Sequence, residues 1–171
     1  MQSLREFKVF TDELLQSNSR NHKLQVLAKY KNNEIVRYFL DYIYNPYIVT
    51  GISQKKLNKP LPQLTESKFL TVQNMLAYIK NNNTGTDETL QHVQAFIRLN
   101  CTEEEAELLK AIIIKRLPLG IDATSINRVM PNLIPTFDVM LASDYWQCMH
   151  KVEGKDFAIT PKIDGGRIIA V

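Results

Sequence analysis

The chain has 171 residues, of which 44% are hydrophobic and 23% charged, a composition typical of a globular protein in water. That length allows one domain with a real core, or one domain and a fragment of another. No apolar run approaches the roughly 20 residues of a membrane helix, and we expect no secretory signal. Two cysteines are too few for a disulfide framework, which favours a reducing, cytoplasmic location.

The charges are unevenly distributed along the chain. The net charge is +3, yet residues 1–60 contain ten basic and five acidic side chains and carry +5, which leaves −2 on the remainder. An excess of cations at one end suits a polyanion such as DNA. Ordinary helices with solvated polar faces would produce the same pattern, so charge alone does not decide between these interpretations.

Most of the chain shows helical spacing of its apolar residues. Two prolines should prevent regular structure in the segment 52–62, which we interpret as a linker. Thr86 can cap one helix, and Thr102 with Glu105 has the spacing of a capping box at the start of another. The predicted helices cover residues 3–16, 21–30, 33–43, 67–81, 87–99, 103–117 and 123–130.

The character of the sequence changes after Pro135. Residues 157–161 and 167–171 are typical of short strands joined through a Gly-Gly turn, and two strands cannot bury a face alone. The predicted fold class is therefore an all-α helical domain followed by the first short β-strands of an α+β domain. We expect the helical domain over residues 1–135 and the truncated start of a second domain over 136–171.

The motif Lys162-Ile163-Asp164-Gly165-Gly166-Arg167 lies between those two predicted strands. A lysine attacks phosphorus only when a desolvated or cation-lined pocket deprotonates it. Glycines allow a sharp turn close to a ligand, an arginine offers donors to ribose or phosphate oxygens, and an aspartate can tie the turn through backbone amides. The alternative is a plain hairpin with an Asp-Gly turn and an exposed lysine.

This pattern resembles the first motif of the covalent nucleotidyltransferases, which comprise DNA ligases, RNA ligases and mRNA capping enzymes. The run Thr160-Pro161-Lys162-Ile163-Asp164-Gly165 is especially similar to small viral ATP-dependent DNA ligases. Leu133-Ile134-Pro135 and Met140-Leu141-Ala142-Ser143 resemble the entry into the nucleotidyltransferase domain of tailed-phage DNA ligases. Residues 115–120 and 125–129 resemble the last helices of their DNA-binding domain. A phage-encoded protein of a bacterial host would fit this resemblance.

The resemblance implies a chemistry for the motif. Lys162 would be the catalytic nucleophile that attacks the α-phosphate of ATP and forms a lysyl-AMP intermediate. The residues that would contact the nucleotide are Thr160, Ile163 and Arg167, and those that would shape the loop are Asp164 and Gly165. The cofactors would be ATP and Mg²⁺, whose ligands the family places downstream of Val171. We therefore expect the chain alone to bind nicked DNA without sealing it.

The resemblance also implies that the helical domain grips duplex DNA on both sides of a nick, as a monomer and without sequence preference. A helix N-terminus after a glycine turn can present free amides to a phosphate, and the segment 120–125 has that form. The candidate DNA-binding residues are Arg116, Gly120, Thr124, Ser125, Arg128, Lys55, Lys56 and Lys59. Each could instead be a solvated surface residue. Backbone contacts of this kind should make binding sensitive to salt.

Other interpretations stay open at this point. A stand-alone α-helical DNA-binding or regulatory protein could carry a vestigial ligase-like tail, and an RNA ligase or capping enzyme would share the motif. Further nucleotidyltransferase motifs in the coding sequence beyond Val171 would indicate a ligase. Cys148 and His150 have no second pair of ligands, so we expect no metal site, and Trp146 could stack on a base or pack between domains.

Overall fold

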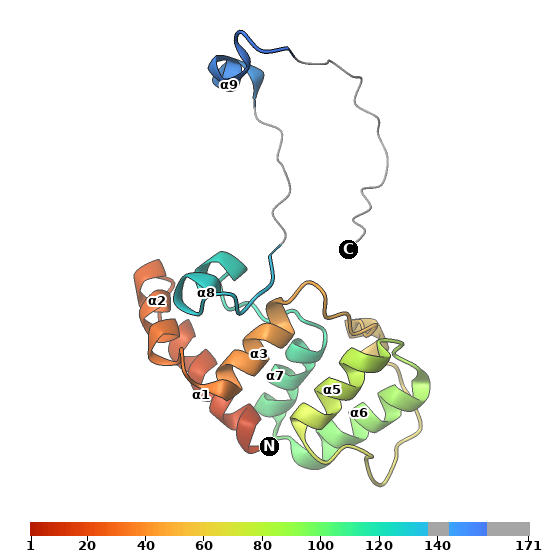
Figure 1. The fold of residues 1–171 in the computed structure, drawn as a ribbon. Helices are drawn as coiled ribbons and strands as arrows, with labels where there is room; N and C mark the ends of the chain where they lie inside the picture. Colours follow the sequence, from red (N-terminus) through yellow and green to blue (C-terminus); the bar gives the residue numbers. More distant parts are fainter. Residues whose placement is uncertain (137–143, 157–171) are drawn as a thin grey trace. The chain divides into compact units, whose positions relative to one another are not determined.

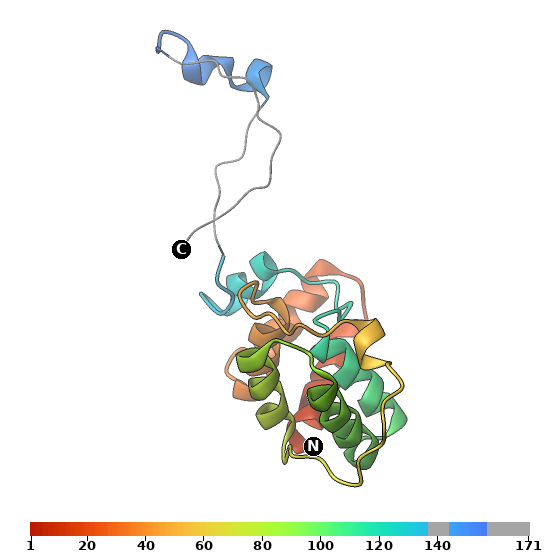
Figure 2. The ribbon, with the colours of Figure 1, turned by 90° about the vertical axis from the view of Figure 1, so that its right-hand side faces the viewer.

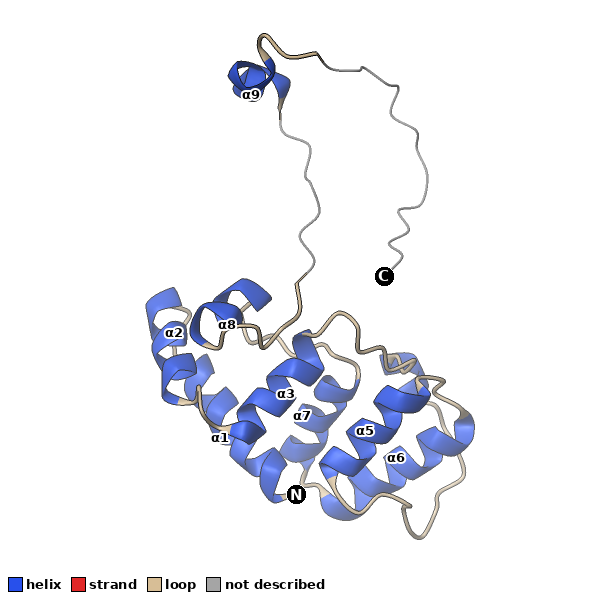
Figure 3. Ribbon diagram, viewed as in Figure 1, coloured by secondary structure: helices blue, strands red, loops and turns tan. Residues whose placement is uncertain are grey.

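The computed structural model of the chain describes residues 1–136 and 144–156. The chain divides into two units, Met1–Thr136 and Phe137–Val171 (Figure 1). All regular elements in the described ranges are helices, as Figure 3 shows. They are α1 (Gln2–Leu15), α2 (Arg20–Lys29), α3 (Glu34–Tyr44), α4 (Gln54–Leu57), α5 (Val72–Asn82), α6 (Asp87–Asn100), α7 (Glu103–Ile113), α8 (Ala123–Val129) and α9 (Tyr145–Val152).

The predicted fold class is wrong in its second half. Residues 1–136 agree with the all-helical expectation, but no β-strand occurs in the described part of the chain. After Pro135 the described residues form helix α9, because the Asp144 carboxylate accepts hydrogen bonds from the amides of Trp146 and Gln147 and caps its first turn. The two segments predicted as strands, 157–161 and 167–171, lie outside the described residues.

Helix α1, drawn in red, packs against α2, α3 and α7 (Figures 1 and 2). Leu4, Phe7, Phe10 and Leu14 recur at helical spacing and are fully buried, as the sequence pattern predicts, whereas Val9 and Leu15 are exposed. The Phe7 ring stacks on Phe39 of α3 with 4.6 Å between ring centroids, and Phe10 meets the Tyr30 ring edge-on at 5.3 Å. These aromatic contacts join the first three helices into one core.

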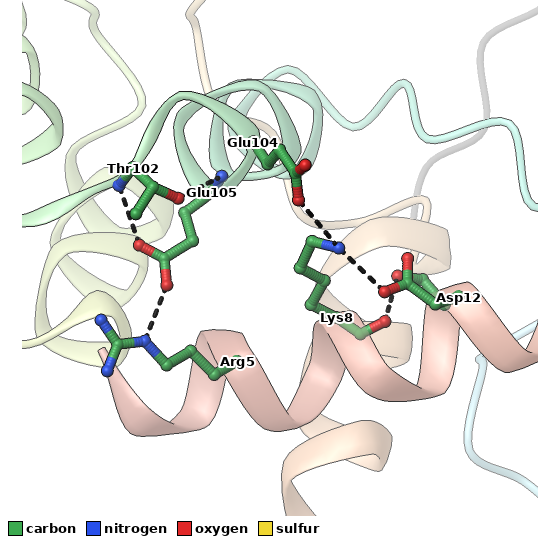
Figure 4. A network of polar contacts seen from close by, with 7 residues as sticks. Arg5, Lys8, Asp12, Thr102, Glu104 and Glu105 are labelled. Atoms are coloured by element: carbon green, nitrogen blue, oxygen red, sulfur yellow. Dashed lines mark hydrogen bonds and ion pairs between the residues drawn. The ribbon is translucent and has the colours of Figure 1, made fainter.

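The predicted capping box at the start of α7 is confirmed (Figure 4). The Thr102 hydroxyl accepts a hydrogen bond from the Glu105 amide, and the Glu105 carboxylate accepts one from the Thr102 amide at 2.9 Å. The same carboxylate accepts a 2.7 Å hydrogen bond from Arg5 Nε on α1. One glutamate therefore caps α7 and also joins it to the N-terminal helix.

An additional helix and a later helix start distinguish the segment after residue 52 from the prediction. The expected linker contains the one-turn helix α4, because the Ser53 hydroxyl caps the Lys56 amide and the turn buries Leu57. Helix α5 begins at Val72 instead of 67, because Thr71 is its N-cap. Phe69 precedes that helix yet is buried, so its apolar side chain fits the helical pattern without belonging to the helix.

The end of α7 also differs from the prediction, since the helix stops at Ile113 instead of Leu117. Lys115 has a left-handed backbone with φ +57°. Its amide bonds to the Ile112 carbonyl at 3.0 Å, and the Arg116 amide bonds to the Ala111 carbonyl at 2.9 Å. These two bonds form a Schellman motif, which ends the helix one turn early and begins the loop leading to α8.

Candidate nucleic-acid interface

Ion pairing divides the cations of the first unit into two groups. Among the described residues, six cations lie within ion-pair distance of a carboxylate, and they are Arg5, Lys8, Lys29, Lys59, Lys68 and Lys110. Residues 111–136 contain three cations and a single acidic residue, Asp122. No described carboxylate pairs with Lys115, Arg116 or Arg128. This segment therefore carries uncompensated positive charge.

Lys115 and Arg116 stand at the Schellman turn but have different roles. The Lys115 ammonium donates to the carbonyl oxygens of Asn45 and Ile48, the second at 2.7 Å, and thereby holds the loop after α3. Burial lowers the pKa of Lys115. Arg116 is exposed, and its guanidinium has no hydrogen-bond partner among the described residues. Arg116 is thus the residue of this pair that can contact a ligand.

Gly120 forms the turn that leads into α8, and its conformation needs a glycine. Its φ is +63°, and a Cβ atom there would lie 2.2 Å from Lys23 Nζ. Lys23, on α2, is 6% exposed and donates to the carbonyl oxygens of Leu119 at 2.7 Å and Gly120 at 3.3 Å. The buried ammonium group of Lys23 therefore holds this turn, a role that the sequence did not predict.

The sequence does contain a signal for Lys23. In α2 it precedes Val26 by three residues and Leu27 by four, so it occupies the face on which those two apolar residues are buried. A lysine at such a position must either reach solvent with its end or find buried oxygen atoms. The structure shows the second outcome, with the oxygens supplied from 96 and 97 residues away.

Helix α8 carries the remaining candidate DNA-binding residues of this segment, Thr124, Ser125 and Arg128. Asp122 is its N-cap, and the carboxylate accepts a hydrogen bond from the Ser125 amide at 2.8 Å. Hydrogen bonds from the side chain and backbone of Ser125 lower the pKa of Asp122. One of the amides predicted for a phosphate is therefore engaged already. Thr124 and Arg128 are exposed, and Ser125 is half-buried.

The C-terminal end of the first unit is fixed beside this helix. The Asn127 side chain donates to the Ile134 carbonyl at 2.7 Å and accepts from the Ile134 amide at 2.9 Å. Ile134 itself is buried. This paired contact holds the segment after α8 against the helix, so Arg128 is carried on a well-anchored element.

The three lysines predicted as linker contacts are all exposed, but they differ in what they bind. Lys59 Nζ pairs with the Asp87 carboxylate at 2.6 Å. Lys56 Nζ donates to the carbonyl oxygens of Gly51 at 2.9 Å and Thr84 at 3.5 Å. Lys55 makes no ion pair or hydrogen bond from its side chain to the described residues. Of the three lysines, Lys55 is therefore the most available to a ligand.

The motif that was predicted to carry the chemistry spans residues 160–167. Thr160, Lys162, Ile163, Asp164, Gly165 and Arg167 all lie outside the described residues. In the described part of the second unit, Tyr145 and Trp146 are exposed on α9, with ring centroids 5.3 Å apart.

No cluster of three or more metal-ligating side chains occurs in the ranges that the structure describes. Nor do those ranges include a helix long and apolar enough to cross a membrane.

Two curated proteins are similar to this chain. They are the DNA ligases of Enterobacteria phage T4 and Enterobacteria phage T6, each 26% identical over 141 residues. The matched region covers 78% of this chain and 28% of each ligase, so the chain spans less than a third of the length of these relatives. No protein-family profile matches the chain. The similarity supports a relationship to phage DNA ligases and a ligase-related function.

Proposed function

We propose that this chain is the DNA-binding N-terminal portion of an ATP-dependent DNA ligase and that residues 1–135 hold nicked duplex DNA by its backbone. The observation that carries the proposal is the segment 111–136, where exposed Arg116 and Arg128 have no acidic partner among the described residues. The similarity to two phage DNA ligases supports the choice of DNA as the polyanion. Phosphate contacts from arginine give affinity without reading sequence.

The catalytic part of the proposal rests on the sequence motif. Lys162 is the residue that takes AMP from ATP, with Thr160, Ile163 and Arg167 at the nucleotide and Mg²⁺ as the accompanying metal ion. Asp164 and Gly165 shape the same loop. Breakage of the α–β phosphate bond of ATP would release pyrophosphate as the lysyl-AMP bond forms. The 171-residue chain tested alone is expected to bind nicked duplex without sealing it.

The decisive experiment for DNA binding is a salt titration of the 171-residue chain on a fluorescently labelled nicked duplex, followed by anisotropy. If three or four phosphates are neutralised, affinity should fall about 40- to 150-fold between about 50 and about 200 mM salt. Two duplexes of unrelated sequence should give the same affinity within about twofold. An affinity that does not change with salt, or that depends strongly on sequence, would contradict backbone binding.

A further inference from the structure

A cavity of about 520 Å³ lies between the start of α2 and the turn that precedes α8. A water molecule takes about 30 Å³ of liquid volume, so a small anion and part of its hydration shell fit inside. The cavity is lined by the polar or charged residues Asn18, Arg20, Lys23, Asp122 and Ser125, together with Leu24, Leu27, Gly120 and Ile121.

The charge of Lys23 is incompletely satisfied in this cavity. Its ammonium group has three N–H donors, and two of them reach the carbonyl oxygens of Leu119 and Gly120. No described carboxylate lies within ion-pair distance of it. A charge with 6% exposure is costly without a counter-charge, and carbonyl dipoles offset only part of that cost.

The other charged groups that line the cavity do not cancel this charge. Arg20 is exposed, so the cavity contains two cations and the single carboxylate of Asp122. That carboxylate already accepts the hydrogen bond from the Ser125 amide. An anion entering the cavity would therefore meet a net positive charge, and the amide group of Asn18 could donate a further hydrogen bond.

We propose that this cavity binds a phosphate group, which in nicked duplex is one phosphodiester of the DNA backbone. Arg20 and Lys23 supply the positive charge, and Asn18 supplies a neutral donor. The inference rests on the proposed DNA binding but names a contact distinct from Arg116 and Arg128. Gly120 is essential to it, because a side chain at that position would displace the Lys23 ammonium from the floor of the cavity.

The first arm of the test compares Arg20→Gln and Asn18→Ala with Lys80→Gln, a matched loss of an exposed cation on α5. Arg20→Gln should weaken nicked-duplex binding about tenfold and reduce the salt slope by about one, which is the signature of one lost phosphate contact. Asn18→Ala should weaken binding less and leave the slope unchanged. Lys80→Gln should stay within about twofold of the unsubstituted chain.

The second arm uses inorganic phosphate and follows the backbone amides of Gly120 and Ser125 by NMR. Phosphate should shift both signals in a saturable way in the unsubstituted chain, and Arg20→Gln or Lys23→Met should weaken that response. Far-ultraviolet circular dichroism shows whether Lys23→Met is folded, and Arg20→Gln carries the test if it is not.

The two arms separate failure of the cavity from failure of DNA binding. If the chain binds duplex with the expected salt dependence but Arg20→Gln behaves like Lys80→Gln and phosphate shifts neither amide, the cavity proposal is overturned and the proposed function stands. If the chain binds no duplex but phosphate shifts both amides and the Arg20→Gln response is weaker, DNA binding fails and the cavity remains an anion site. If the chain binds no duplex and phosphate shifts neither amide signal, the DNA-binding proposal and the cavity proposal are both overturned.

Discussion

The α1–α7 junction and the α2–α8 end of the first unit use their cations in opposite ways. At the junction, Arg5 meets Glu105, and Lys8 meets Asp12 at 2.8 Å and Glu104 at 3.3 Å (Figure 4). At the other end, the cations of residues 111–128 are held by carbonyl oxygens or are exposed without a described acidic partner. The cations of the α1–α7 junction are thus used in ion pairs between helices, whereas those of the α2–α8 end remain available to a ligand.

The comparison explains why the total charge of +3 says little about binding. An exposed ion pair contributes at most about 1 kcal/mol to stability, yet it cancels a charge that a polyanion could otherwise use. Lys29 with Glu13 and Lys110 with Glu107 are cancelled in this way. The net charge counts paired and unpaired cations alike, so it does not show which cations remain available to a polyanion.

The largest effect is expected from removing two unpaired arginines together. Arg116→Gln with Arg128→Gln should weaken nicked-duplex binding about 100-fold and lower the salt slope by about two, because each arginine is assigned one phosphate. Lys29→Gln with Lys110→Gln removes the same charge from paired positions. Anisotropy titrations of both double variants should separate them, and equal losses would show that only net charge matters.

A smaller effect, on stability, is expected at the junction. Glu105→Ala removes the reciprocal cap of α7 and should lower the free energy of unfolding by about 1–2 kcal/mol. Arg5→Leu should cost less stability than Glu105→Ala, because the Arg5 side chain is 63% exposed. Urea unfolding measures both. Duplex affinity should not change in either variant, and a loss there would place the junction inside the interface.

The same carboxylate should make stability depend on pH. Hydrogen bonds from Arg5 and from the Thr102 backbone lower the pKa of Glu105 below the ordinary value of 4.5. Its stabilising contribution is therefore complete above pH 4.5 and is lost as the pH falls through the lower folded-state pKa. Glu105→Gln, which keeps a capping side chain without the charge, should lose less stability than the unsubstituted chain between about pH 5 and about pH 3. Parallel losses in the two proteins would rule out Glu105 as the source.

The smallest effect is expected among the linker lysines. Lys55→Gln should weaken duplex binding about twofold to threefold, because its ammonium group is uncommitted and exposed. Lys59→Gln should have no measurable effect, since Asp87 already neutralises that lysine. Anisotropy at low salt gives the best resolution. A larger loss for Lys59→Gln would mean that DNA displaces Asp87 on binding.

The sequence predicted the helices wherever local rules decide them. Apolar periodicity places α1, α3 and α6, and the Thr102 capping box fixes the start of α7. The end of α7 was not predictable, because the left-handed residue is Lys115 and not a glycine. The four-residue helix α4 was missed because the nearby prolines favoured a linker over the short helix that Ser53 caps. Helix α9 was missed because its aspartate cap precedes a segment that was assigned to the start of a β-rich domain.

The candidate interface was predicted less completely than the fold. Arg116 and Arg128 were predicted as DNA contacts from their neighbours in sequence, and both are exposed. The role of Lys23 depends on carbonyl oxygens about one hundred residues away, which no local pattern reveals. The pairing of Lys59 with Asp87 across 28 residues is equally nonlocal. Sequence thus identified which residues carry charge, whereas tertiary packing determines which charges remain unpaired.

The contact between α1 and α7 has a consequence for synthesis of the chain. Arg5 and Glu105 are separated by 100 residues, and α1 packs against α7 in the finished unit. At about 5–20 residues per second, a ribosome completes α7 roughly 5–20 s after α1. During that interval part of the apolar surface of α1 lacks its final cover. Helix α1 therefore stays partly uncovered until α7 has been made, and a chaperone on the nascent chain would meet its exposed apolar surface during that interval.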